Sequence, residues 1–315
     1  MSLSSVQATP VRAAGGTRRK GRREARERLF AAALLGPALL VLAGLILYPL
    51  YKVVDISFRV GPSMNLARLG QQPLGLQNYV RILGDSVLWE AVKASGVYVG
   101  GSVALAFVAG LWTAMLLNAR LPGRRFLRTV LLLPWAVPGI VASVIFSWMF
   151  DGSYGVVNAL FRYTGISNAD TPWLMNADTA MITVVIATAW KAYPLITLTI
   201  LAAMQTIPSE LYEAASVDGA SPAQKFRFVT LPGIASAGLV SVLISALWIF
   251  VDVDIIFGST GGGPALATST LPLYIYNEAF QFFRMGTAAA AGVVMMIAAI
   301  VASGFVFAAI RKQRF

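Results

Sequence analysis

Long apolar runs separated by short polar stretches dominate this sequence. The hydrocarbon core of a bilayer is about 30 Å thick and a helix rises about 1.5 Å per residue, so roughly 20 apolar residues cross it. Backbone groups inside a bilayer must find hydrogen-bond partners within their own segment, which favours helices. The pattern therefore predicts an all-α integral membrane protein with six transmembrane helices, near residues 30–54, 94–118, 127–150, 179–204, 234–257 and 285–310. Pro134, Pro138 and Pro194 are expected to kink the third and fourth helices.

Composition supports the membrane class and excludes much chemistry. Of 315 residues, 57% are hydrophobic and 12% are charged, which is far from the average of soluble domains. The chain has no Cys and no His, which excludes disulfides, thiolate or imidazole metal sites and Ser-His-Asp or Cys-His catalysis. We therefore expect no catalytic residues, no metal site and no cofactor bound by this chain.

The net charge of +11 comes largely from basic segments next to the predicted spans. Residues 1–29 are rich in Arg and lack an apolar period, which predicts a disordered segment. A nucleic-acid-binding arm is the alternative, but basic residues beside a span are more typical of a cytoplasmic topology signal. The basic positions assigned to the cytoplasm are Arg12, Arg18, Arg19, Lys20, Arg22, Arg23, Arg26, Arg28, Arg120, Arg124, Arg125, Arg128, Lys225, Arg227, Arg311, Lys312 and Arg314. This places both termini, including a tail at residues 312–315, in the cytoplasm of a multi-pass protein without a nucleic-acid partner.

The connection between the fourth and fifth spans, residues 205–233, is patterned as two short helices, and we call it the knuckle. Ser209 is placed to cap a first helix containing Glu210 to Ala215, and Gly219 supplies a left-handed stop. Ser221, Pro222 and Gln224 form a capping-box pattern for a second helix that ends near Leu231-Pro232. The pattern predicts a small helical projection into the cytosol.

Glu213-Ala214-Ala215 followed by Gly219 resembles the E-A-A-x-x-x-G signature of ABC importer permeases. In that family the knuckle is a coupling helix that docks in a cleft of a cytoplasmic ATPase, so the resemblance assigns Glu213, Ala214, Ala215 and Gly219 to coupling. It also implies the type I importer permease fold, known as MetI-like, within a six-span domain at residues 30–311. No Walker motif occurs in the chain, so ATP and Mg²⁺ are expected on separate subunits.

Further local patterns resemble the sugar-type permeases for maltose and glycerol phosphate. They are Gly75 to Tyr79 (GLQNY), Leu133-Pro134, Trp190 with Pro194, and Thr260 to Pro264 (TGGGP). The resemblance implies a permease subunit of a binding-protein-dependent importer for a sugar or polyol in the cytoplasmic (inner) membrane of a prokaryote. The implied partners are a second homologous permease, two cytoplasmic ABC ATPases, an extracytoplasmic solute-binding protein, the sugar and the lipid bilayer.

Polar residues within the predicted spans point to the substrate path, because polar groups in hydrocarbon usually face a bundle interior or a wet cavity. One face of the fourth span carries Thr188, Lys191 or Ala192, and Leu195, and one face of the fifth carries Ser245, Trp248 or Ile249, and Asp252. By the resemblance, these stretches line the sugar site in maltose-type permeases, and a tryptophan can stack on a sugar face. The candidate path residues are Thr188, Trp190, Lys191, Ser245, Trp248 and Asp252.

Two alternatives remain open at this point. Asp252 and Asp254 can instead form a buried pair with Lys191 or cap the outer end of the fifth span. An ion-coupled secondary carrier that uses Asp252, Asp254 and Lys191 is the alternative function.

Overall fold

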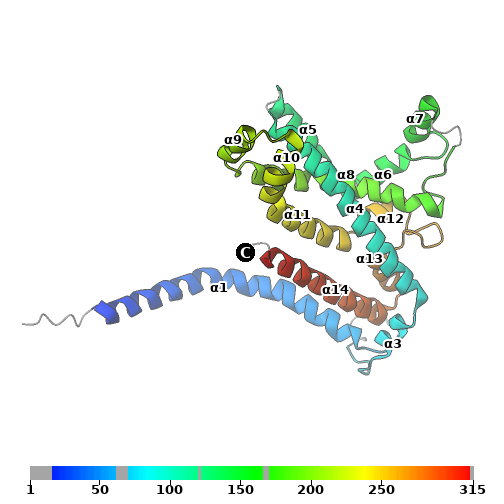
Figure 1. Ribbon diagram of the computed structural model, residues 1–315. Helices are drawn as coiled ribbons and strands as arrows, with labels where there is room; N and C mark the ends of the chain where they lie inside the picture. Colours follow the sequence, from blue (N-terminus) through cyan, green and yellow to red (C-terminus); the bar gives the residue numbers. More distant parts are fainter. Residues whose placement is uncertain (1–15, 62–69, 120–121, 166–169, 313–315) are drawn as a thin grey trace, which may run out of the picture. The chain divides into compact units, whose positions relative to one another are not determined.

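The computed structural model describes residues 16–61, 70–119, 122–165 and 170–312. Within them the chain is helical apart from turns and one isolated bridge between Arg59 and Leu74. The elements, shown in Figure 1, are α1 (Gly16–Ser57), α3 (Gln77–Leu83), α4 (Ser86–Asn118), α5 (Arg124–Ala136), α6 (Gly139–Met149), α7 (Val156–Thr164), α8 (Ala177–Met204), α9 (Ser209–Val217), α10 (Pro222–Lys225), the π-helix η1 (Phe226–Thr230), α11 (Leu231–Val251), α12 (Asp254–Ser259), α13 (Leu271–Tyr276), the π-helix η2 (Asn277–Gln281) and α14 (Met285–Lys312).

The chain divides into two compact units, one up to Asp55 and one from Ile56 onward. In the first unit, α1 begins at Gly16, so the expectation of disorder is wrong for residues 16–29. Arg, Lys, Glu and Ala dominate that stretch and are good helix formers, and it leads directly into an apolar helix. Residues 1–15 lie outside the described residues. The apolar part of α1, Ala32–Ser57, has a mean hydropathy of 2.2.

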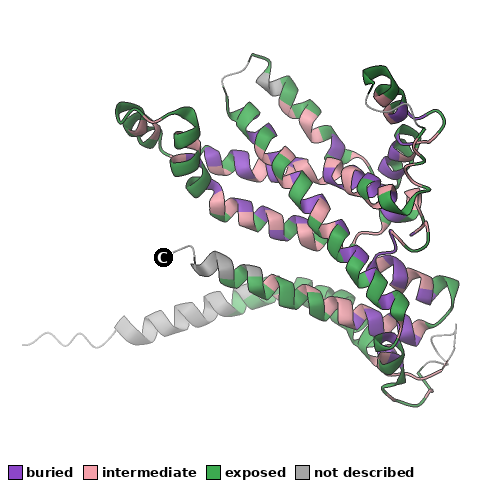
Figure 2. Cartoon of the chain, turned by 45° about the vertical axis from the view of Figure 1, so that its right-hand side comes forward, coloured by how far each residue is buried: buried purple, intermediate pink, exposed green. Residues whose placement is uncertain are grey.

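The second unit is built on the parallel pair α4 and α8, against which α11 packs. Gly110 of α4 allows close approach, because a Cβ added there would lie 2.8 Å from Cγ2 of the buried Ile196. The hydroxyls of Thr113 and Thr197 lie 2.6 Å apart across the same interface. Figure 2 shows buried residues along α4, α8 and α11, whereas α9 and α10 have none.

Among the described residues, five helices are long and apolar enough to cross a membrane, and a sixth span is counted if α5 and α6 are taken together. The expected third span, residues 127–150, is not one kinked helix: α5 and α6 meet at 99°. Pro138 explains the break, because proline disfavours helical backbone in the preceding residue, and Val137 is extended at ψ 126°. Helix α8, by contrast, continues through Pro194.

The fifth span also differs from the expected residues 234–257. Its helix ends at Val251, and the backbone of Asp252 is extended. Oδ1 of Asp252 accepts a hydrogen bond of 3.0 Å from the backbone N–H of Asp254, where the short helix α12 begins. A side chain that binds a following N–H in this way competes with helix continuation.

Within the second unit, the GLQNY segment contacts Ser57, Arg59 and Gly286. Nδ2 of Asn78 donates to the backbone oxygens of Ser57 (2.9 Å) and Arg59 (2.8 Å). The hydroxyl of Tyr79 lies 2.7 Å from that of Ser57. A Cβ at Gly286 in α14 would lie 2.6 Å from Nδ2 of Asn78, so the amide occupies the space that a side chain would fill.

Replacing Gly110 with Val should destabilise the protein by about 1–3 kcal/mol, the usual cost of overpacking a filled interface. Gly100→Ala on the same helix is the matched control, because no heavy atom lies within 4 Å of a Cβ there. Thermal unfolding of the detergent-solubilised protein measures both. Equal melting temperatures for Gly110→Val and the wild type would contradict the close α4–α8 approach.

Candidate functional site

The first half of the knuckle is helix α9, which carries the signature residues. It ends in a Schellman motif: the N–H of Ala220 donates to the carbonyl of Ala215 (2.9 Å), and the N–H of Gly219 donates to that of Ser216 (3.1 Å). Gly219 has φ +74°, so the predicted left-handed stop is present. The N-cap position is Pro208 and has no side-chain cap, so the prediction of Ser209 as the cap was wrong.

The second half of the knuckle starts at the predicted capping box. The hydroxyl of Ser221 accepts from the N–H of Gln224 (3.4 Å), while Oε1 of Gln224 accepts from the N–H of Ser221 (2.7 Å). The expected end near Leu231-Pro232 was wrong, because α10 continues through η1 into α11. Pro232 lies in the first turn of α11, where the missing N–H is tolerated within the looser π-turn geometry. Residues Pro222–Val251 thus form one 30-residue helical span.

The knuckle projects from the bundle, and hydrogen bonds connect its first helix, α9, to the segment that leads into α11. In the views of Figures 1 and 2, α9 and α10 lie at the opposite end of the helices from α7. The hydroxyl of Tyr212 lies 3.0 Å from that of Thr230, and Nζ of Lys225 donates to the hydroxyl of Ser216 (2.8 Å). Glu213, Ala214 and Gly219 are exposed and Ala215 is partly exposed, together with apolar Val217 at 88%. The signature residues are therefore available to a partner on a surface held rigidly to the membrane helices.

A cavity of about 130 Å³ lies between α5, α8 and α11. Its lining includes charged side chains of both signs, hydroxyls and aromatic rings. Its lining residues are Trp135, Thr188, Lys191, Ala192, Leu195, Ser245, Trp248, Ile249 and Asp252. The two faces that helical spacing predicted for the fourth and fifth spans therefore meet around one cavity.

Two tryptophans differ from the expectation. Trp190 does not line the cavity; its ring packs against Phe146 in the core, with ring centroids 5.4 Å apart. Trp135, at the end of α5, lines the cavity but was missed by the sequence analysis, which treated residues 127–150 as one span. Its place beside Pro134 at a helix break was the available signal. Trp135 and Trp248 are 51% and 54% exposed, so this chain leaves the cavity open on one side.

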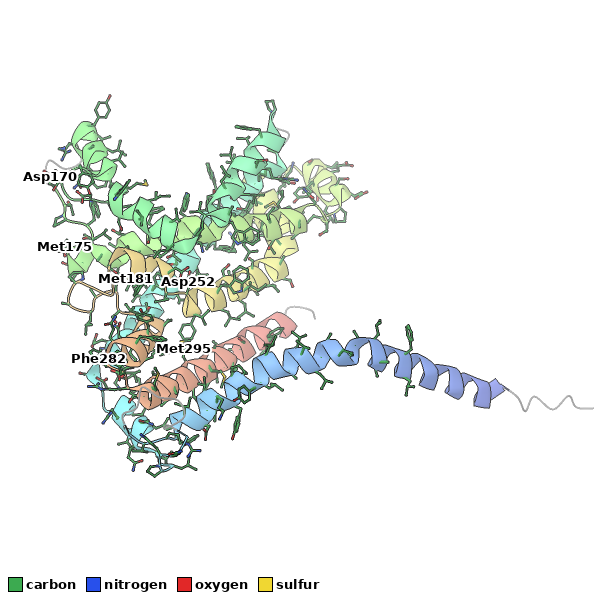
Figure 3. The ribbon with its side chains drawn as sticks, turned by 180° about the vertical axis from the view of Figure 1, so that it is seen from behind. Asp170, Met175, Met181, Asp252, Phe282 and Met295 are labelled. Atoms are coloured by element: carbon green, nitrogen blue, oxygen red, sulfur yellow. The ribbon has the colours of Figure 1, made fainter. Side chains whose placement is uncertain are left out.

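The polar groups of the cavity are only partly paired. The Oγ of Ser245 is buried and has no hydrogen-bond partner among the described residues, whereas the hydroxyl of Thr188 lies 2.7 Å from that of Tyr98. Lys191 and Asp252 both face the cavity, but among the described residues Lys191 forms no ion pair with Asp252 or Asp254. Asp252, labelled in Figure 3, lies at the end of α11, where its Oδ1 accepts the hydrogen bond from the N–H of Asp254, as the capping alternative expected. Asp252 also lines the cavity. The two charges thus share the cavity without a direct ion pair in the described part of the chain.

Comparisons with known proteins agree with this arrangement. Residues 106–315 match the family described as binding-protein-dependent transport system inner membrane component. The chain belongs to this family. It is thus a permease subunit of an ABC transporter, a non-catalytic component of the inner membrane.

Similar proteins within the family span most of the chain. The trehalose/maltose transport system permease protein MalF of Thermococcus litoralis is 35% identical over 245 residues, covering 77% of this chain and 80% of that protein. The sulfoquinovosyl glycerol transport system permease protein SmoG of Agrobacterium fabrum is 34% identical over 270 residues, covering 85% and 86%. The diacetylchitobiose uptake system permease protein DasB of Streptomyces coelicolor is 33% identical over 297 residues, covering 91% and 89%.

Solved structures confirm the expected fold. A chain of a bacterial ABC transporter for import of the acidic polysaccharide alginate has a TM-score of 0.78 at 23% identity, with 93% of this chain and 99% of that chain covered. A chain of the MetNI methionine ABC transporter has a TM-score of 0.52 at 19% identity, with 72% and 96% covered. The chain thus has the ABC importer permease fold, and the alternative of an ion-coupled carrier finds no support.

Replacing Gly219 with Ala should loosen the knuckle, because a residue with a Cβ pays about 1–2 kcal/mol in the left-handed region. A Cβ there would meet no atom within 4 Å, so the effect is conformational rather than steric. Gly219→Asn is the matched control, since Asn tolerates this conformation. Hydrogen exchange of the amides of residues 205–230 measures the change. Identical exchange in the Ala and Asn variants would contradict this role of Gly219.

Proposed function

We propose that this permease conducts a sugar or related polyol, and that the cavity between α5, α8 and α11 is its share of the sugar site. The observation that carries the proposal is the buried hydroxyl of Ser245, which has no partner in the part of the chain that the structure describes, in a cavity that also has two half-exposed tryptophans. A buried hydroxyl without a partner is costly, and a sugar hydroxyl can satisfy it. Sugar rings present apolar faces to aromatic side chains and hydroxyls to polar ones. The substrates for which the similar permeases are named favour the same class.

The size and openness of the cavity support a site shared with a second, homologous permease. About 130 Å³ is small beside the roughly 300–1,000 Å³ typical of small-molecule sites. The exposed sides of Trp135 and Trp248 leave room for a partner to complete the enclosure. A solute-binding protein would deliver the sugar from the outer face, and the basic cytoplasmic segments would set both termini inside.

Coupling to ATP hydrolysis is assigned to Glu213, Ala214, Ala215 and Gly219 on the exposed surface of the knuckle. Two cytoplasmic ATPase subunits would bind the ATP and Mg²⁺, and this chain would bind neither. The small alanines permit close approach, and the Glu213 carboxylate can pair with a basic group of the ATPase. Because α8 and α11 both reach the cavity and are joined by the knuckle, displacement of the knuckle changes how Thr188 and Ser245 face each other. This links ATPase closure to access from alternate sides.

The substrate test uses the whole transporter in lipid vesicles with ATP inside, the binding protein outside, and a panel of trehalose, maltose, diacetylchitobiose and sulfoquinovosyl glycerol. Ser245→Ala should lower uptake of the transported sugar about fivefold to tenfold, the value of one hydrogen bond. Ser241→Ala is the matched control, because that buried hydroxyl donates to the carbonyl of Gly238 (2.8 Å) away from the cavity. ATP-independent uptake, or transport of none of these sugars, would contradict the proposed function.

The coupling test replaces Glu213 with Ala. ATPase activity stimulated by the sugar-loaded binding protein should fall at least tenfold, because the helix loses its charged contact with the ATPase, while membrane insertion stays intact. Glu210→Ala removes a carboxylate of the same helix outside the signature and should have a smaller effect. ATPase assays and co-purification of the subunits measure the two steps separately. Normal stimulation of ATPase activity in the Glu213→Ala variant would contradict the coupling assignment.

A further inference from the structure

The hydroxyl of Thr188 behaves differently from those of its neighbours on α8. Thr183, Thr197 and Thr199 each donate to the backbone carbonyl four residues earlier, at 3.2, 3.0 and 2.9 Å. Within the described residues, Thr188 has no such bond; its Oγ1 lies 2.7 Å from the phenolic oxygen of Tyr98 on α4. Thr188 is also the one of these four threonines that lines the cavity. Its hydroxyl is therefore drawn away from its own helix at the place where substrate contact is proposed.

Tyr98 is placed to act as the hydrogen-bond donor of this pair. Its side chain is 1% exposed, and in the described part of the chain its hydroxyl has the bond to Thr188 as its single hydrogen bond. A phenol is a stronger hydrogen-bond donor than an aliphatic alcohol, and each hydroxyl has one hydrogen and two acceptor lone pairs. When Tyr98 donates to Oγ1 of Thr188, the hydrogen of Thr188 is left to point elsewhere. The open direction is the cavity.

We propose that Tyr98 is a specificity-determining positioning residue, which holds the hydroxyl of Thr188 so that it donates into the cavity to an acceptor oxygen of the sugar. This inference rests on the proposed function and adds a residue that does not line the cavity. Ser245 on α11 has a hydroxyl without a partner among the described residues. The cavity then presents one hydroxyl from α8 and one from α11, the two helices that the knuckle connects. Substrates that carry an oxygen at this position are preferred over deoxy analogues, which leave the donor unpaired.

The proposal predicts what happens without the phenol. In Tyr98→Phe, the ring still fills the core, but Thr188 loses its partner and can turn to the carbonyl of Val184, as its neighbours turn to theirs. The donor is then withdrawn from the cavity, as it is in Thr188→Val. The two substitutions should therefore have the same consequence and should not add.

The experiment is a double-mutant cycle on the complete transporter in lipid vesicles, with the sugar of the panel above that the wild type transports. Tyr98→Phe and Thr188→Val should each lower the uptake rate at saturating binding protein about fivefold to tenfold. The double variant should be no slower than Thr188→Val, and Thr188→Ser, which keeps the hydroxyl, should transport within twofold of the wild type. A packing role for the Tyr98 hydroxyl would instead multiply the two losses.

Thr197→Val is the matched control. It removes the hydroxyl contact with Thr113, which joins the same two helices in the core away from the cavity, and uptake should stay within twofold of the wild type. If Thr188→Val slows uptake but Tyr98→Phe does not, or if the two losses multiply, the role of Tyr98 is overturned while the sugar site stands. If neither Thr188→Val nor Ser245→Ala slows ATP-dependent uptake, the cavity assignment itself fails. Co-purification with the partner subunits checks that each variant folds.

Discussion

The unbroken run from α10 through η1 to α11 is the constraint on which the rest of this permease depends. One helical segment, Pro222–Val251, begins at the capping box of the knuckle and ends beside the cavity, where it carries Ser245 and Trp248. A helix transmits displacement along its axis because every turn is hydrogen-bonded to the next. The contacts of Tyr212 with Thr230 and of Lys225 with Ser216 hold α9 to this segment. A partner that moves the knuckle therefore moves one wall of the cavity.

The other wall is held by the packing of α4 on α8. Gly110 allows close packing, because its missing side chain leaves space for Ile196. Two pairs of hydroxyls, Tyr98 with Thr188 and Thr113 with Thr197, also connect the helices in the core. Polar contacts of this kind satisfy side chains that lipid cannot, and they set the rotation of α8 about its axis. Thr188 faces the cavity because that rotation is set, so a residue that never lines the cavity, Tyr98, can still determine what it offers.

The breaks in the membrane segments also follow from local chemistry. Pro138 holds Val137 in extended backbone and separates α5 from α6, and Asp252 ends α11 by binding the N–H of Asp254. A Cβ at Gly139 would lie 2.6 Å from Cβ of Asp254, so the second break packs directly against the first. Both breaks lie next to cavity residues, Trp135 and Asp252. Irregular backbone at membrane depth is tolerated where it is enclosed by protein or borders a cavity.

Local sequence was sufficient to determine the long apolar helical segments, the left-handed turn at Gly219 and the capping box at Ser221. These features depend on hydropathy, backbone freedom and hydrogen bonds between residues a few positions apart. Helical spacing also determined which residues of α8 and α11 share a face, so Thr188, Lys191, Ser245, Trp248 and Asp252 could be placed together. Only the tertiary structure decided that α10 runs on into α11, that α5 and α6 bend apart, that Trp135 rather than Trp190 reaches the cavity, and that Tyr98 holds Thr188 from 90 residues away. Such contacts depend on how distant segments pack, and a periodic apolar pattern is the same whether a helix bends at a proline or continues through it.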